Sequence, residues 1–345
     1  MREAARVCVI IPAYGVNAYI ADALDSVMAQ TLADFEVVVV DDGGPPDEAA
    51  ELRAIVDRYD GRFRYIQRPN GGQAAARNTA LLATAAPLVA FLDGDDYWHP
   101  TLLERELALF DHDPSLDLAY CDARLFGEGP WAGRTYMECG DDSVGPVTLE
   151  ALLARRVNVT MSTIIARREA VLAAGSFDES LRYVEDYDMW LRMAHRGARM
   201  AYITEPLAYR RVRGSSLSAD TLKMQRAVVH VLEQFERNHE LSASARAAWQ
   251  DAVARARSRA GLAAAKISLS SGRVASAAEA LRVVRPHDAS WKVRAAGVGL
   301  RAVPKMVGVM YRAWSWMLDA RLRRATARAA RRTLPPPPTR RDAAS

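Results

Sequence analysis

The sequence contains few cysteines, and none are spaced for pairing. Its 345 residues include only Cys8, Cys121 and Cys139, and no two of them form a Cys-x-x-Cys pair. This usage indicates neither a disulfide framework nor a zinc site, and it is typical of a reducing compartment. We therefore exclude the small disulfide-stapled folds and expect a cytoplasmic protein.

Long hydrophobic runs are also missing. The chain has no stretch of about 18 consecutive apolar residues, the length that a membrane-spanning helix requires. Residues 1–6 lead directly into an apolar strand pattern, without the apolar core of a signal peptide. The sequence thus predicts neither a spanning helix nor a secretion signal.

Two common phosphate-binding signatures are absent as well. There is no G-x-x-x-x-G-K-[ST] loop, and no G-x-G-x-x-G follows the first predicted strand. Both loops hold phosphates through backbone N–H groups. Their absence argues against a P-loop ATPase and a dinucleotide dehydrogenase, and it favours a metal ion as the group that holds any bound diphosphate.

Charge is unevenly distributed along the chain. The net charge is +4, yet residues 291–345 hold 13 Lys and Arg against two Asp, which leaves −7 for residues 1–290. A basic tail on an acidic body indicates an anionic partner. Trp314 and Trp316 lie in this tail, and one interpretation is a segment that makes peripheral contact with an anionic membrane surface on the inner face of the cell membrane. A basic helix packed on the preceding helices is the alternative, and no nucleic-acid partner is expected because no recognised binding module accompanies the charge.

Strands and amphipathic helices alternate in the first part of the chain. Apolar runs predict strands at 7–11, 35–40, 63–67 and 88–92, and helical spacing predicts helices at 19–29, 47–59, 71–82 and 101–110. Strands unbroken by polar residues, each followed by a helix, are typical of a parallel sheet covered on both faces. The predicted class is α/β, with a Rossmann-like and mostly parallel sheet.

The remainder of the chain predicts three regions. A strand at 116–122, a loop at 127–147, an edge strand at 159–166 and short strands at 201–203 and 207–211 complete a first domain, 1–220. Alanine-rich helical patterns at 222–237, 243–269 and 274–285 predict a C-terminal α-helical extension, 221–290, whose last two helices form a hairpin. We expect residues 291–345 to be a basic, amphipathic and proline-rich tail that is partly disordered.

Acidic residues follow the predicted strands. Asp93-Gly94-Asp95-Asp96 comes directly after the strand that ends at Leu92, and Asp41-Asp42 ends the second strand. Asp122 and Glu185-Asp186 are further acidic positions at strand ends or after strands. Ligands bind at the carboxyl edge of open α/β sheets, and paired carboxylates suit a hard divalent cation that arrives with phosphates. Taken alone, the Asp93–Asp96 pattern fits a solvated acidic turn or a helix cap equally well.

The order of these motifs resembles that of family 2 glycosyltransferases, across residues 7–212. The resemblance rests on Val9–Tyr14, Ala23–Val27, Phe35–Gly43, Gly71–Asn78, Phe91–Trp98 and Glu185–Arg192. It implies a GT-A fold, in which the first-strand residues Pro12, Ala13 and Tyr14 line a nucleotide pocket, Asp42 binds the nucleobase, and Arg77 lies near the nucleotide or diphosphate.

The same resemblance implies a metal-dependent donor site. Asp93 would contact the ribose, Asp95 would bind Mg²⁺ or Mn²⁺ with Asp93 beside it, and Gly94 would lie against the nucleotide sugar. Asp186 would be the general base, with Glu185 next to it. Arg210 would steady the leaving diphosphate.

Those residue types suit direct transfer of a sugar. A bound cation neutralises a departing diphosphate, and a carboxylate removes the proton of the attacking hydroxyl. One base and no protein nucleophile imply inversion at the anomeric centre. The predicted function is an inverting hexosyltransferase of cell-surface polysaccharide biosynthesis, which uses a nucleoside-diphosphate sugar and a glycan or lipid-linked acceptor.

The chain also departs from the family pattern. Gly44-Pro45-Pro46 stands where Ser or Thr usually follows, and Gly15 stands in place of Asn. The Gln-x-x-Arg-Trp motif of processive synthases is missing after Asp186, which favours single addition. Two alternatives stay open: a sugar-phosphate nucleotidyltransferase, whose Gly-rich first loop is not seen here, and a non-catalytic nucleotide-sugar-binding scaffold of the same fold.

Overall fold

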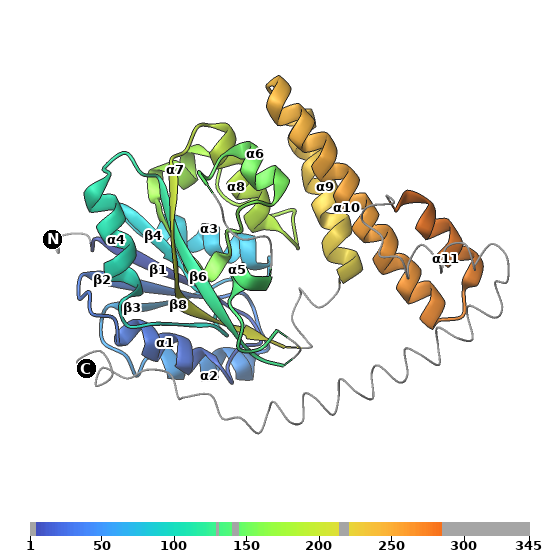
Figure 1. Ribbon diagram of the computed structural model, residues 1–345. Helices are drawn as coiled ribbons and strands as arrows, with labels where there is room; N and C mark the ends of the chain where they lie inside the picture. Colours follow the sequence, from blue (N-terminus) through green and yellow to red (C-terminus); the bar gives the residue numbers. More distant parts are fainter. Residues whose placement is uncertain (1–4, 129–130, 140–144, 214–220, 285–345) are drawn as a thin grey trace. The chain divides into compact units, whose positions relative to one another are not determined.

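The computed structural model describes residues 5–128, 131–139, 145–213 and 221–284. They divide into two compact units (Figure 1). The first unit holds the described residues up to Val212 except Glu128, and the second holds the described residues from Arg213 onward. Each unit is described by itself.

The first unit is built on one mixed sheet of eight strands, in the order β3-β2-β1-β4-β7-β6-β8-β5. The strands are β1 (Val7–Ala13), β2 (Phe35–Asp41), β3 (Phe63–Gln67), β4 (Leu88–Phe91), β5 (Tyr97–Trp98), β6 (Leu118–Gly127), β7 (Ile164–Arg167) and β8 (Met200–Val212). The neighbours β3, β2, β1 and β4 run parallel, as do β6 and β8. β7 is antiparallel to both of its neighbours, and β5 is antiparallel to β8.

Helices cover both faces of this sheet (Figure 1). The apolar faces of α1 (Ile20–Met28), α2 (Pro46–Val56) and α4 (Leu102–His112) pack in one core with alternate residues of β1 and β2. The helices α3 (Gln73–Ala83), α7 (Arg168–Ala173) and α8 (Glu185–His195) lie on the other face. Shorter segments are α5 (Tyr136–Cys139), α6 (Leu149–Ala154) and the 3₁₀ turn η1 (Met161–Thr163). The predicted α/β class, with a mostly parallel sheet covered on both faces, is confirmed.

Four local predictions were wrong in the second half of this unit. The strand at 159–166 is β7, which begins at Ile164 and lies inside the sheet between β4 and β6. β6 continues beyond Asp122, so this carboxylate lies at a bulge within the strand rather than at its end. The two short strands after residue 200 are one strand, β8, and the predicted loop contains α5. The three errors in strands concern long-range pairing, which local apolar spacing does not report, and α5 is a helix of only four residues.

The second unit is helical. Its described elements are α9 (Thr221–Asn238), α10 (Ala243–Ser270), α11 (Val274–Ala280) and the 3₁₀ turn η3 (Leu281–Val283). The turn before α11 contains Gly272 at φ +74°, and a Cβ on Gly261 would lie 2.6 Å from the Ala280 carbonyl oxygen. Small residues therefore let α11 fold back closely on α10. No helix among the described residues is long and apolar enough to cross a membrane, and the predicted tail from residue 291 lies outside them.

A buried carboxyl group in α4 gives the first testable prediction. Glu106 is fully buried, and neither carboxylate oxygen has a hydrogen-bond partner of normal geometry among the described residues. Burial raises the pKa of Glu106 well above its ordinary 4.5, and the Cys121 thiol and Ile165 backbone oppose only part of the shift. Above about pH 4.5 the unfolded chain releases this proton, whereas the folded protein keeps it. The free energy of unfolding therefore falls as the pH rises above 4.5.

We expect Glu106→Met to increase stability. The apolar side chain removes buried polar atoms that lack partners, which is worth about 1–3 kcal/mol in the free energy of unfolding at pH 7. Urea unfolding at pH 7 and at pH 4 measures the effect, and the gain should shrink at pH 4. An equal gain at both pH values would contradict the assignment of a buried carboxyl that resists ionisation.

Candidate functional site

The carboxyl ends of three neighbouring parallel strands bring the predicted motifs to one edge of the sheet. Ala13 at the end of β1 pairs in register with Asp41 of β2, and Asp42 N donates to the Ala13 carbonyl at 3.0 Å. The acidic turn follows β4 on the other side of β1. A Cβ on Gly94 would lie 2.9 Å from the Val16 side chain, so only glycine allows the turn to pack this closely on the segment after β1.

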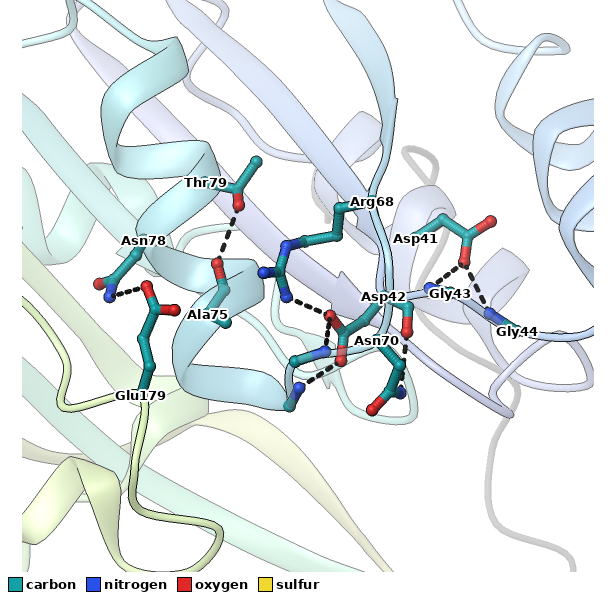
Figure 2. A network of polar contacts seen from close by, with 12 residues as sticks. Asp41, Asp42, Gly43, Gly44, Arg68, Asn70, Ala75, Asn78, Thr79 and Glu179 are labelled. Atoms are coloured by element: carbon teal, nitrogen blue, oxygen red, sulfur yellow. Dashed lines mark hydrogen bonds and ion pairs between the residues drawn. The ribbon is translucent and has the colours of Figure 1, made fainter.

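The Asp42 carboxylate organises the start of α3 (Figure 2). It accepts hydrogen bonds from the backbone N–H groups of Gly71 at 3.0 Å and Gly72 at 2.7 Å, and it pairs with the Arg68 guanidinium at 2.5 Å. The Asp42 carbonyl oxygen accepts a further bond from the Asn70 amide. A negative charge at a helix N-terminus is favourable because the first N–H groups have no partner within the helix. These hydrogen bonds from Asp42 therefore fix the Gly71-Gly72 loop beside the end of β2.

Arg77 of α3 joins two of the predicted carboxylates. Its side chain is only 1% exposed, and it donates to Glu185 at 2.6 Å and to Asp93 at 2.8 Å. Burial alone would lower the pKa of this guanidinium, but Asp93 and Glu185 raise it, so Arg77 is held as a cation. The acidic turn and the first residue of α8 are thereby tied together although they lie far apart in the sequence.

The first turn of α8 presents two adjacent carboxylates. Val184, which precedes the helix, has φ +56°, a left-handed conformation that is strained for a β-branched residue. Glu185 is buried against Arg77, whereas Asp186 stays partly exposed. Loss of solvation and the neighbouring Glu185 charge raise the pKa of Asp186 to about 6. A carboxylate with such a pKa is suited to accept a proton near neutral pH.

Arg210 of β8 faces the same carboxylates. Its guanidinium lies over the Tyr136 ring of α5, 5.3 Å from the ring centre. Burial alone would lower the pKa of Arg210, but Tyr136 and the charges of Asp96, Asp93 and Asp186 raise it. The charge of Arg210 thus interacts with Asp93 and Asp96 of the acidic turn and with Asp186 of α8.

Most of the predicted residues come together here. Arg77 and Arg210 link Asp93, Glu185 and Asp186 in one group, and Gly94 and Asp95 belong to the same turn as Asp93. Pro12 and Ala13 end β1, and Tyr14 follows with 60% of its surface exposed. Sequence reasoning missed Asp96, Ser162, Tyr136 and Arg211. Asp96 and Arg211 adjoin predicted residues, but no local pattern indicated Ser162 or Tyr136.

The donor set at the acidic turn fits a hard cation. Asp93 remains 27% exposed at its side chain, and Asp95 is also partly exposed. The described residues contain no cluster of three or more His, Cys, Asp or Glu side chains that could hold a metal ion. Mg²⁺ commonly uses one or two carboxylates together with waters and substrate phosphates, so two carboxylates on one turn are sufficient.

Two family models match the sequence. The model of glycosyl transferase family 2 matches residues 8–154, and that of glycosyl transferase family group 2 matches residues 88–322, more than half of the chain. An uncharacterized glycosyltransferase of Haemophilus influenzae is 29% identical over 247 residues, 68% of this chain and 81% of that protein. EpsJ of Bacillus subtilis, also an uncharacterized glycosyltransferase, is 31% identical over 220 residues, 61% of this chain and 62% of its own length.

Solved structures share the fold. TarS of S. aureus in complex with UDP-GlcNAc has a TM-score of 0.61 at 19% identity, covering 90% of this chain and 92% of that chain. The mannosyltransferase PcManGT of Pyrobaculum calidifontis, in complex with GDP-Man and Mn²⁺, has a TM-score of 0.57 at 19% identity, with 91% and 88% covered. At this identity the likeness shows the GT-A fold and no more.

Proposed function

This chain belongs to glycosyltransferase family 2, and from that premise we propose that it transfers a sugar, with inversion, from a nucleoside-diphosphate sugar to an acceptor hydroxyl. The observation that carries the proposal is the Asp186 carboxylate. It is partly exposed, has a pKa raised to about 6, and faces Arg210 as the acidic turn does. These properties support Asp186 as the proton acceptor and Arg210 as a cation shared by Asp186 and the acidic turn.

In the proposed reaction, Asp186 accepts the proton of the acceptor hydroxyl. The hydroxyl oxygen then forms a bond to the anomeric carbon, and the bond from that carbon to the diphosphate oxygen breaks with its electron pair on the diphosphate. Because attack and departure take place on opposite faces, the anomeric configuration inverts. Glu185 keeps the pKa of Asp186 high through its charge, and Arg77 holds Glu185 in place.

Asp93 and Asp95 would hold the divalent cation, Mg²⁺ or Mn²⁺. When bound, the cation supplies Lewis-acid stabilisation of the charge that develops on the diphosphate. Arg210 adds a second positive charge, kept protonated by the carboxylates that it faces. The buried cation Arg77 acts through Asp93, since its guanidinium is already occupied by two carboxylates.

Donor recognition would take place at the ends of β1 and β2. Pro12, Ala13 and Tyr14 would line one side of the proposed pocket, and Gly94, by letting the acidic turn pack on Val16, would bring that turn beside the donor. Asp42 would contact the nucleobase: a carboxylate has about four lone-pair positions, and three are used by Arg68, Gly71 and Gly72. One position therefore remains for a base N–H group.

The acceptor in this proposal is a glycan or a lipid-linked glycan, in cell-surface polysaccharide biosynthesis. The support is the basic segment after residue 291, which would hold the protein on the cytoplasmic face of an anionic membrane. In this proposal residues 1–220 carry out catalysis, residues 221–290 form a helical hairpin region, and residues 291–345 contact the membrane.

Calorimetry with a panel of nucleoside diphosphates and nucleotide sugars tests the donor site. We expect nucleotides of one base to bind in the presence of Mn²⁺. Asp95→Ala should weaken this binding more than mutation of a residue that only supports a metal ligand, which typically costs about 10- to 100-fold. Asp111→Ala, at a surface pair with Arg6, is the matched control and should bind as the wild type does.

Failure of the folded wild-type protein to bind any member of the panel would contradict the donor site. Binding of nucleotide sugars without turnover would favour the non-catalytic nucleotide-sugar-binding scaffold. Formation of a nucleotide sugar from a sugar 1-phosphate and a nucleoside triphosphate would favour the nucleotidyltransferase.

A further inference from the structure

Arg211 lies next to Arg210 in β8, and its side chain makes a separate set of contacts. Successive side chains of a strand point to opposite faces, so the guanidinium groups of the two arginines have different neighbours. The Arg211 side chain is 18% exposed, and its guanidinium is sandwiched between two aromatic rings, 4.6 Å from the centre of Tyr19 and 4.5 Å from that of Phe126. This stacking restricts the guanidinium to one position.

From that position, Arg211 connects the acidic turn to α1. Its Nε donates to the carbonyl oxygen of Asp95 at 3.0 Å, and its Nη2 donates to the Asp22 carboxylate at 2.9 Å. Asp22 belongs to the first turn of α1, a helix fully packed on the core face of the sheet. The peptide that bears Asp95 is therefore anchored to the rigid part of the unit.

The backbone of Arg211 holds the turn at a second point. Its N–H group donates to one carboxylate oxygen of Asp96 at 2.7 Å, while the other oxygen accepts from the Ser162 hydroxyl at 2.6 Å. Ser162 Oγ in turn accepts from Asp93 N at 3.2 Å. Asp96 is 2% exposed, so this set of bonds is shielded from water. The turn is consequently held at Asp93, Asp95 and Asp96 from two other elements, β8 and η1.

We infer that Arg211 is a positioning residue that presets the acidic turn for its divalent cation. Asp93 and Asp95 carry like charges and repel one another, and without an anchor the turn would relax in a way that separates them. Fixing the backbone before the cation arrives removes an ordering cost from binding. The inference rests on the proposed function, because it takes the turn to be the cation site.

The test compares Arg211→Met with the wild type by calorimetry, with and without Mn²⁺, and the probes are the same panel of nucleoside diphosphates, including UDP and GDP. We expect Mn²⁺-dependent binding to weaken by about 10- to 100-fold, as for other residues that orient metal ligands. Binding without Mn²⁺ should be unchanged. Asp22→Asn removes only the far end of the anchor, at a side chain that is 42% exposed, and should show a smaller loss of the same kind.

Arg62→Met is the matched control. Arg62 also combines an ion pair, with Asp60 at 2.8 Å, and stacking, on Phe35 at 4.3 Å, but it lies before β3, at the opposite edge of the sheet. It should leave nucleotide binding unchanged. Thermal unfolding confirms that each variant is folded, and Asp22→Asn carries the test if Arg211→Met does not fold.

The outcomes separate the two hypotheses. A wild-type protein that binds no nucleoside diphosphate of the panel in Mn²⁺ would overturn the proposed function itself. A wild type that binds in Mn²⁺, together with folded Arg211→Met and Asp22→Asn variants that bind equally well, would overturn only the role of Arg211. Equal weakening with and without Mn²⁺ would also overturn it, because that result indicates general disruption of the site.

Discussion

Asp186→Asn is expected to lower kcat by about 10²- to 10⁴-fold, the usual contribution of a positioned general base. The amide cannot accept the hydroxyl proton, but it has nearly the same shape as the carboxylate. The backbone N–H of Tyr187, which donates to Asp186 at 2.7 Å, can still donate to the amide oxygen. Donor binding, measured by calorimetry, should therefore persist, so the loss should appear in kcat rather than in donor affinity.

The pH profile of the wild type supplies a second readout of the same residue. Burial and Glu185 raise the pKa of Asp186 to about 6, and only the deprotonated form accepts a proton. The rate should therefore fall below pH 6, by about tenfold at pH 5. Glu185→Gln removes the neighbouring charge and should move this fall in rate to lower pH. A fall in rate at the same pH in that variant would contradict its assignment to Asp186.

Arg77→Met is expected to lower the free energy of unfolding by about 3–5 kcal/mol, because it leaves two carboxylates without their buried cation. Urea unfolding measures the loss. Adding Glu185→Gln to Arg77→Met should recover part of it, since one of the uncompensated charges is then absent. Such coupling between the two sites is expected of side chains in direct contact.

Arg105→Met is the control for a surface ion pair. Arg105 pairs with Glu205 at 2.7 Å, and both side chains are about half exposed. Its loss should cost no more than about 1 kcal/mol. If Arg77→Met were equally mild, Arg77 would not be the buried connection between the acidic turn and α8 that the geometry describes.

Local sequence signals were sufficient to predict the strands in the parallel half of the sheet. The strands β1, β2 and β4 are predominantly apolar, and their composition indicates that they are buried on both faces of the sheet. The edge strand β3, with Arg64 and Gln67 exposed, was predicted from its mixed apolar and polar pattern. The acidic turn could be predicted for the same reason, because the carboxyl ends of parallel strands share one edge. The helices followed from their apolar spacing.

The connections between distant segments could not be predicted. Nothing near Arg77 indicates that its partners are Asp93 and Glu185, the second of which is 108 residues away. Ser162 looks like an ordinary loop serine until η1 brings it against Asp96. β7 was expected at an edge because its antiparallel insertion between β4 and β6 depends on pairing rather than on its own residues. Residue types thus indicate the chemistry, whereas the pairing of strands decides which residues act together.

The stereochemistry of donor cleavage tests the central claim most directly. An α-linked nucleotide sugar that the protein binds is followed by proton NMR as it is cleaved in the presence of Mn²⁺, with water or a simple sugar as acceptor. Direct attack assisted by Asp186 predicts that the β-anomer forms first, and that Asp186→Asn abolishes its formation. First formation of the α-anomer, or cleavage at the wild-type rate by Asp186→Asn, would contradict the account.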